Sequence, residues 1–494
     1  MADNTERGKS NWGRKLSRCC LFRQRVVLEV MGLLAIIVCY MTRICLSHAI
    51  TVLVIKQTNE SKSSFNLSHY CARDDNFNVP AGKHNWSEIL QGLILSSFFI
   101  GYFVTQLPGV ILTERYGGKW ILTVGMFFSG LASVLSPLII KSFGPYAFMV
   151  LRIVMGLGQG LAFPALRGII DRWIPPIERG TLGAFIICGA MLASLVANLF
   201  SGILLARFHW SVVFIAFGGL TLIWCIFFTF LCYSYPVAHP YISTKELNYL
   251  YGEMGELGRV SKPPVPWKQI LTSGSLWPLI MAQFGYDWGM SLIINDLPKY
   301  FSHILGIGVL NNGVYTSMLF IPLATSGIIF GFIGDCLILR ELMEVTSVRK
   351  LMTVIAAWGA GAFMIGASYA NCQRLIVIAL FMMSMFYMGS YYTGIKLVPM
   401  DLSPNNAGYI AAVVNSIGTI AAFLAPTTTG FILSYASQEK LKPSFYYPYE
   451  NICNFLSTER LLALAVGLLA GIWVTFRHRY SIPLMGYCRG ATLR

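Results

Sequence analysis

The sequence predicts an all-α polytopic membrane protein with 12 transmembrane helices. Hydrophobic residues make up 55% of the 494 residues and charged residues only 12%, whereas soluble globular proteins carry about 25% charged residues. Apolar windows of about 20 residues, the length that spans roughly 30 Å of hydrocarbon, also recur along the chain. The predicted spans are 26–55, 88–112, 119–140, 145–169, 181–206, 210–233, 275–301, 312–338, 350–370, 373–399, 406–435 and 460–477.

The positive net charge of +15 indicates orientation in a bilayer rather than nucleic-acid binding. The basic residues lie in short loops between apolar runs and do not share one soluble face. Seven lysines and arginines precede the first span, and Arg477 and Arg479 follow the last one. We therefore expect cytosolic tails at 1–25 and 478–494. The polar, basic start of the chain shows no signal peptide.

The first large loop, residues 56–87, is expected on the opposite side of the membrane from both tails. It contains three N-x-S sequons, so glycosylation is predicted at Asn59, Asn66 and Asn85. Asn85 lies close to the predicted start of the second span, where the bilayer would hinder modification.

The longest polar stretch in the middle of the chain, residues 234–274, is predicted to be a cytosolic linker. It separates a first six-helix bundle, 26–233, from a second one, 275–477. Charged turns recur at matching places, in 109–119 of the first bundle and 331–340 of the second. Such an internal repeat is typical of a transporter whose two halves rock around a central site.

Two arginines lie deep in predicted spans of the first bundle. A charge at the bilayer centre costs roughly 2.5–3.5 kcal/mol on insertion scales, so Arg152 is expected to face a wet cavity or a ligand. Arg43 lies about 17 residues into its span, or ~25 Å along a helix. A guanidinium binds planar oxyanions through paired donors, which favours an anion site. The alternatives are outward snorkelling of Arg43 and a structural ion pair for Arg152.

Several motifs carry a resemblance to a known family. The turn 109–119 resembles the signature loop of the major facilitator superfamily. Further motifs, in family order, resemble the anion/cation symporter family of sialin, vesicular glutamate transporters and type I phosphate cotransporters. They are residues 98–102 (FFIGY), 106–109 (QLPG), 173–179 (WIPPIER), 346–350 (TSVRK) and 401–405 (DLSPN).

This resemblance implies the major facilitator fold, with two six-helix bundles around a solute path, and anionic substrates. The family's arginines of the first and fourth helices match Arg43 and Arg152. Relatives carry proton-coupling glutamates within two turns after the second arginine, and this chain has Met155 and Gln159 there. Where glutamate and sialic acid carriers of the family have a histidine, this chain has Arg167. An ion pair with Asp171, four residues later, would also explain an arginine at this position.

In the second bundle, Lys396 is the basic residue nearest the expected path, close to Tyr387 and a pair of tyrosines. It is expected to add positive charge to the path, unless it snorkels to the cytosol or pairs with Asp401. Asp287 is the acidic residue that could carry a coupling proton or sodium ion if it faces the path. Near the surface it would merely be solvated.

The sequence thus predicts a secondary active transporter of a small anion, working by alternating access and driven by sodium or voltage. The alternatives are a proton-coupled symporter that uses Asp287 and a non-transporting sensor or scaffold. Arg43, Arg152, Gln159, Tyr387 and Lys396 are the candidate substrate-binding residues. The candidate gating residues are Glu114, Arg115, Asp171, Arg172, Asp335 and Asp401.

The remaining expectations concern partners and location. No catalytic triad, metal cluster or nucleotide-binding loop is visible, so neither an enzyme nor a resident cofactor is predicted. Na⁺ or H⁺ is the expected coupling ion. We expect a monomer in the plasma membrane or in a lysosomal, endosomal or vesicle membrane, with lipid and the anion as its partners.

Overall fold

The computed structural model of the chain describes residues 23–55, 82, 84–175, 178–240, 242–254, 265–370, 372–403 and 406–439. Over these residues the chain is helical, and the extended contacts are limited to a bridge between Val54 and His84. The all-α prediction is confirmed. The predicted span 460–477, most of both tails and most of the loop 56–87 lie outside the described residues.

The first half of the molecule runs from α3 to α9 and is followed by short linker helices. Its helices are α3 (Gln24–Leu53), α4 (Glu88–Tyr116), α5 (Gly118–Ser142), α6 (Gly144–Gly160), α7 (Ala162–Trp173), α8 (Arg179–Arg207) and α9 (Ser211–Leu231). The linker contains η1 (Pro236–Ala238), α10 (Thr244–Met254) and α11 (Trp267–Thr272).

The second half runs from α12 to α20. Its elements are α12 (Leu276–Ser291), the π-helix η2 (Leu292–Asp296), α13 (Leu297–His303), α14 (Val309–Met318), α15 (Phe320–Leu339), α16 (Val345–Val354), the π-helix η3 (Ile355–Gly359), α17 (Ala360–Tyr369), α18 (Arg374–Met388), the 3₁₀ helix η4 (Gly389–Tyr392), α19 (Val398–Leu402) and α20 (Ala407–Glu439).

Within the described part of the chain, ten helical segments are long and apolar enough to cross a membrane. They correspond to the predicted spans except 275–301 and 460–477. The elements α12, η2 and α13 follow one another without a break and cover the predicted span 275–301. The chain is therefore a multi-pass membrane protein, as the sequence predicts.

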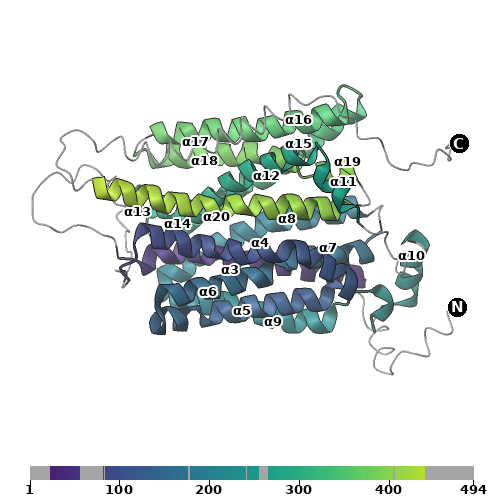
Figure 1. Ribbon diagram of the computed structural model, residues 1–494, viewed down its shortest axis with the longest axis horizontal. Coiled ribbons are helices and arrows are strands. Elements are labelled where there is room, and N and C mark those ends of the chain that lie inside the picture. Colours follow the sequence, from purple (N-terminus) through teal and green to yellow (C-terminus); the bar gives the residue numbers. More distant parts are fainter. Residues whose placement is uncertain are drawn as a thin grey trace, which may run out of the picture.

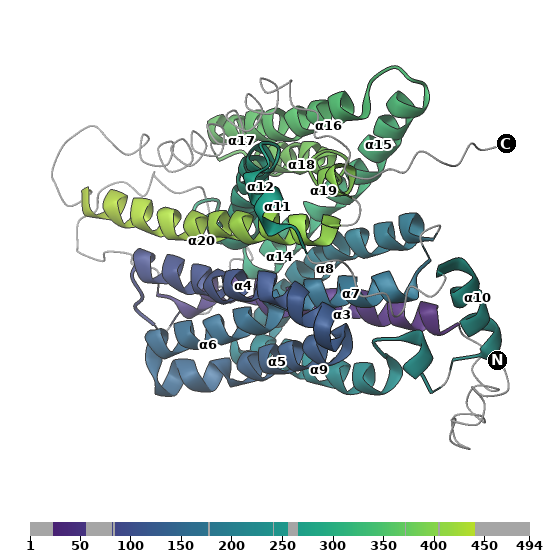
Figure 2. The ribbon, with the colours of Figure 1, turned by 45° about the vertical axis from the view of Figure 1, so that its right-hand side comes forward.

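The two halves lie side by side, with α20 of the second half along α4 of the first (Figures 1 and 2). Further contacts join α8 to α14 and α3 to α13. We call this contact region the seam. We call the end of the helices where α3 ends and α4 begins the loop end, on the left in Figure 1. The opposite end, where α3 begins and α7 ends, is the basic end.

Local chemistry fixes where several helices begin and end. Ser87 caps α4, because its hydroxyl accepts a hydrogen bond from the Leu90 amide at 3.3 Å. Gly117 has φ of +85°, a conformation open to glycine, and it separates α4 from α5. At the basic end, Glu246 of the linker helix α10 accepts hydrogen bonds from the backbone amides of Gln24 and Arg25 at the start of α3. The linker thereby caps the first transmembrane helix.

One predicted helix is shorter than expected. The span 373–399 predicts a helix throughout, but α18 ends at Met388 and the chain continues in a 3₁₀ turn. A Cβ added to Gly389 would lie 1.8 Å from the Ser326 hydroxyl oxygen of α15, so the backbone is pressed against the neighbouring helix there. This close approach depends on tertiary packing and is not visible in the hydropathy of the segment.

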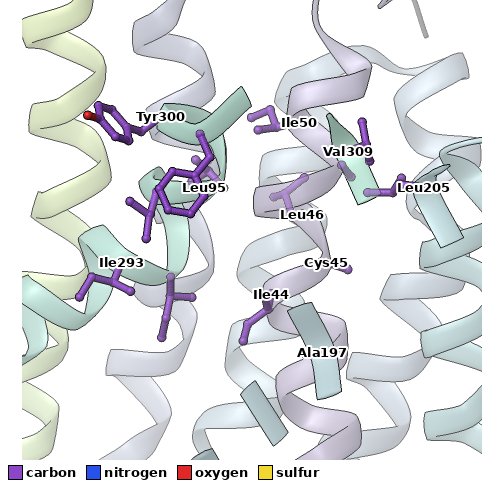
Figure 3. Packing of buried hydrophobic residues seen from close by; sticks show 14 of the residues in the cluster. Ile44, Cys45, Leu46, Ile50, Leu95, Ala197, Leu205, Ile293, Tyr300 and Val309 are labelled. Carbon is purple, nitrogen blue, oxygen red and sulfur yellow. The ribbon is translucent and has the colours of Figure 1, made fainter. Parts of the chain in front are cut away.

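The seam is apolar toward the loop end. One buried hydrophobic cluster joins α3, α4 and α8 of the first half to η2, α13 and α14 of the second. Figure 3 shows part of this cluster, with side chains of both halves meeting, among them Ile44, Cys45, Leu46, Ile50, Leu95, Ala197, Leu205, Ile293, Tyr300 and Val309. The halves are therefore closed against each other at this level.

Candidate functional site

Arg152 lies in the middle of the first half, on α6, and its side chain is only 3% exposed. An added Cβ on Gly156 would lie 2.0 Å from the Phe98 carbonyl oxygen, so α4 lies directly on α6. This approach brings the Phe98 ring to 5.3 Å from the Arg152 guanidinium carbon. The Arg152 Nη1 contacts the Met155 sulfur at 3.3 Å, and its Nε is buried without a hydrogen-bond partner among the described residues.

Arg43, on α3, lies among aromatic rings. Its guanidinium carbon is 4.6 Å from the ring centroid of Phe99 and 5.3 Å from that of Phe98. The rings of Tyr40 and Tyr102 follow at 5.8 and 5.7 Å. Such cation–π contacts are worth about 0.5–2 kcal/mol each, and they stabilise a cation without neutralising its charge.

The two arginines share the Phe98 ring. Each guanidinium carbon lies 5.3 Å from the ring centroid, so the two groups are no more than twice that distance apart. Over the described residues, neither Arg43 nor Arg152 forms an ion pair with a carboxylate. The structure thus brings two positive charges together, and neither has an ion-pair partner in the described part of the chain. A carboxylate or phosphate between them would supply a counter-charge.

Gln159 lies outside this pair, inside the first half. It is 0% exposed, and its amide nitrogen donates to the hydroxyls of Thr42 at 2.9 Å and Ser129 at 2.8 Å. Its amide oxygen accepts from the Cys39 thiol at 3.1 Å. All three partners belong to the neighbouring helices α3 and α5. In this conformation Gln159 holds helices together and has no polar group directed at a solute.

The second half contributes an acidic and aromatic group. Gln283 donates to the Asp287 carboxylate at 2.8 Å and accepts a hydrogen bond from the Tyr391 hydroxyl. Tyr391 stacks on Tyr286, with centroids 3.5 Å apart and planes 7° apart. Asp287 is partly buried, and the charges of Lys396 and Arg43 act on it. The Asp287 carboxylate lies against α20, since a Cβ added to Gly418 would lie 2.3 Å from its Oδ2.

Lys396 lies near this group. Its ammonium group donates to the Asn415 side-chain oxygen at 3.3 Å and lies 5.8 Å from the Tyr391 ring centroid. Asp401, the other partner considered for it, forms an ion pair with Arg349 at 2.9 Å. The charge of Arg167, an exposed residue of α7, acts on Lys396 across the seam.

Tyr387 is not brought to the arginines. Its ring stacks on Phe363 of α17 at 5.3 Å, and an added Cβ on Gly359 would lie 2.5 Å from the same ring. Both contacts lie within the second half.

The candidate gating residues lie at the basic end but do not form one cluster. Glu114 of α4 accepts a hydrogen bond from the Tyr409 hydroxyl of α20 and so joins the two halves. Arg172 donates to the backbone carbonyl oxygens of Thr113 and Glu114 at 3.2 and 3.3 Å. Asp401 pairs within the second half, as described above. The other three, which are exposed, are Arg115, Asp171 and Asp335.

Sequence reasoning missed a polar contact across the seam at the loop end. Lys299 of α13 forms an ion pair with Glu88 of α4 and donates to the Gln91 side-chain oxygen at 2.6 Å. Nothing in the local sequence indicates that these distant residues meet. The aromatic set around Arg43 was also missed, although residues 98–102 are one of the motifs that carry the family resemblance.

One of the three predicted glycosylation sites falls within the described residues. Asn85 is exposed and lies three residues before α4, while Asn59 and Asn66 lie outside the described residues. In the described part of the chain, no three His, Cys, Asp or Glu side chains come together as a metal site.

Comparison with known proteins agrees with this architecture. The family model of the Major Facilitator Superfamily matches residues 32–426. A putative inorganic phosphate cotransporter of Drosophila melanogaster is 30% identical over 430 residues, which cover 85% of this chain and 80% of the relative. Human sialin is 29% identical over 412 residues, covering 83% of this chain and 82% of sialin.

Other similarities extend this set. The vesicular glutamate transporter 1 of Bos taurus is 27% identical over 363 residues, covering 72% of this chain and 64% of the relative. The crystal structure of a D-xylose-proton symporter superposes with a TM-score of 0.63 at 16% identity, covering 91% of this chain and 97% of that one, and shows the shared fold. The chain therefore belongs to the Major Facilitator Superfamily, and within it to the anion/cation symporter family.

Proposed function

We propose that the protein is a secondary active transporter that carries a small organic or inorganic anion by alternating access of its two halves. Arg43 and Arg152 would bind the anion. The observation that carries this proposal is the pair of guanidinium groups that each lie 5.3 Å from the Phe98 ring centroid, with no carboxylate paired to either over the described residues.

Arg43 and Arg152 carry charges that no ion pair in the described part of the chain offsets. A buried charge without a partner is destabilising by several kcal/mol, and a chain keeps such a group where a ligand completes it. Phe98 alone cannot offset two cations, because a cation–π contact leaves the charge in place. An anion that accepts hydrogen bonds from both guanidinium groups would neutralise the pair. The relatives include proteins named for phosphate, sialic acid and glutamate transport, all of which handle anions.

The driving force is proposed to be sodium or the membrane potential. The two positions at which relatives carry glutamates hold Met155, in contact with Arg152, and Gln159, in its network of hydroxyls. Neither side chain can take up or release a proton. One elementary charge that crosses 100 mV gains about 2.3 kcal/mol, enough to drive accumulation of about fiftyfold.

Proton coupling through Asp287 is the alternative, and one observation favours it. Asp287 lies against α20, the helix of the second half that packs along α4, and the charges of Lys396 and Arg43 act on it. A carboxylate in that place could take up a proton when the anion binds, because the anion would compete with it for the same cations. A pH gradient should then drive uptake, and Asp287→Asn should remove that dependence while leaving exchange of anion intact.

The structure also suggests which side is closed. Cys372, between α17 and α18 at the loop end, is disulfide-bonded, and disulfides persist in oxidising compartments. Together with the basic cytosolic loops, this supports a loop end that faces outside the cytosol or into an organelle lumen. The apolar cluster and the Lys299–Glu88 pair would then close the outer side, so transport requires them to separate.

The test is uptake by purified protein in liposomes. Labelled sialic acid, glutamate, phosphate and urate would each be offered with an imposed potential, with a sodium gradient and with a pH gradient. We expect saturable uptake of at least one anion, abolished by Arg43→Ala or Arg152→Ala and retained in Arg207→Ala, a control at an exposed arginine of α8. No saturable flux of any anion would favour a sensor or scaffold, and uptake retained in either variant would remove that arginine from the site.

A further inference from the structure

His48 lies in the seam near the loop end and is only 1% exposed. Its Nε2 is 2.8 Å from the Asn198 side-chain oxygen on α8. The hydroxyl oxygen of Thr316, on α14 of the second half, lies 3.5 Å from the same nitrogen. An ionisable side chain of α3 is therefore enclosed where both halves meet, and it belongs to neither the anion site nor the acidic group around Asp287.

The hydrogen bonds determine which nitrogen of His48 carries the proton. The Asn198 side-chain nitrogen donates to the Ser194 carbonyl oxygen at 2.7 Å, so the Asn198 oxygen faces His48. That oxygen can only accept, which places a hydrogen on His48 Nε2. The other ring nitrogen, Nδ1, is buried with no hydrogen-bond partner among the described residues. The ring is thus in its neutral form, with a bare nitrogen in an apolar surrounding.

No neighbouring group would support a positive charge on this ring. Among the described residues, the side chains within hydrogen-bonding distance of the ring are those of Asn198 and Thr316, and neither carries a charge. α14 presents the Thr316 hydroxyl near the ring, and Lys299 of α13 is paired with Glu88. Toward the loop end, the titratable or charged groups on the described elements packed around it are Arg43 and Cys45 on α3, Glu88 on α4, Arg207 at the end of α8, Tyr315 on α14, Asp296 on η2 and Lys299, Tyr300 and His303 on α13.

The two halves are tightly packed close to His48, one turn along α8 from Asn198. Gly202 of α8 and Gly313 of α14 touch through their backbones, since a Cβ added to Gly313 would lie 2.6 Å from the Gly202 Cα. A second N–H on His48 would therefore stay unsatisfied, at a cost of about 1–3 kcal/mol before the cost of the buried charge is added. Protonation of His48 and closure of the seam oppose each other.

We propose that His48 is a proton-binding site that regulates the transporter, and that its protonation from the loop end holds the two halves apart there. This rests on the alternating access of the proposed function. Proton binding and opening are linked, so acid on that side favours the conformation open toward it. A hydrated imidazole titrates near pH 6.5, so the ratio of open to closed molecules should rise roughly tenfold between pH 7.5 and pH 5.5.

The experiment measures opening directly and without substrate. Spin labels attached through ketone-bearing residues at Tyr146 and Leu375, exposed positions of α6 and α18 at the loop end, report the distance between the halves in lipid nanodiscs. In the natural protein, the ratio of the long-distance to the short-distance population should rise about tenfold from pH 7.5 to pH 5.5. His48→Gln, which keeps a donor toward Asn198, should abolish this response.

A matched control and a second variant keep the test independent of misfolding. His209→Gln changes an exposed histidine at the same end and should leave the response unchanged. Asn198→Asp would place a carboxylate against His48, so a protonated ring could remain in the closed seam and acid should no longer open it. A response that persists in His48→Gln, or that is absent from the natural protein, overturns the proposal.

The outcomes separate this inference from the proposed function. An intact pH response in a protein that transports no tested anion would contradict the transport proposal alone. Saturable uptake without any His48-dependent opening would contradict the regulatory role alone.

Discussion

Met155→Glu is the sharpest single change for the anion site. The Met155 sulfur lies 3.3 Å from Arg152 Nη1, so a carboxylate at this position would reach the same guanidinium group. It would occupy the donors that we assign to the anion. The change also restores the type of residue that relatives carry at this position, so the helix is expected to tolerate it.

The size of the effect follows from this distance. Two unit charges about 4 Å apart interact by about 4 kcal/mol at an effective dielectric constant of about 20. Part of this is lost to desolvation of the new carboxylate, since Met155 is 2% exposed. Each 1.4 kcal/mol is a factor of ten in affinity, so we expect the KM for the anion to rise at least tenfold and by up to about a thousandfold.

The assay is the concentration dependence of anion uptake into liposomes at a fixed potential and neutral pH. Met155→Gln is the control of similar size without charge, and its KM should stay within about threefold of the natural value. Added to Arg152→Ala, Met155→Glu should cause little further loss, because its target charge is gone. An unchanged KM in Met155→Glu would refute the assignment of Arg152 to the anion site.

Three further predictions concern the seam, the first half and the linker. Gly313→Ala should lower transport at least tenfold and shift spin-label distances at the loop end toward opening, because its Cβ would meet Gly202; unchanged distances would contradict the closed packing. Gln159→Glu should give uptake that rises as pH falls, because only the protonated acid resembles the buried amide, and pH-independent uptake would refute this. Burial alone would raise the pKa of Glu178, but hydrogen bonds from Tyr249 and an arginine lower it. The stabilisation of the fold by ionised Glu178 is present at neutral pH and is lost as pH falls through the lowered pKa. Glu178→Gln should therefore lower the melting temperature at pH 7, and the difference in melting temperature from the natural protein should shrink below about pH 4.3. A difference that stays constant with pH would contradict this prediction.

Most of the fold could be predicted from the sequence because a membrane helix must satisfy its own backbone and cover about 20 apolar residues. That requirement is local, so hydropathy alone placed the spans. The breaks within spans depend on neighbours and were missed. Residues 292–296 form a π-turn, and α18 ends where Gly389 meets α15.

The site was only partly accessible from the sequence. The depth of Arg43 and Arg152 indicated that each needs a partner, but their meeting on one ring depends on how α4 packs against α3 and α6. His48 could not be identified from the sequence, because the polar groups that meet its ring belong to Asn198 and Thr316, which lie 150 and 268 residues further along the chain.

A cryo-electron microscopy map of the protein in nanodiscs, with its best-transported anion bound, tests the central claim most directly. We expect density for the anion within hydrogen-bonding distance of both guanidinium groups, Arg43 and Arg152, beside the Phe98 ring. Density for the anion elsewhere, with both guanidinium groups still resting only on aromatic rings and the Met155 sulfur, would contradict it.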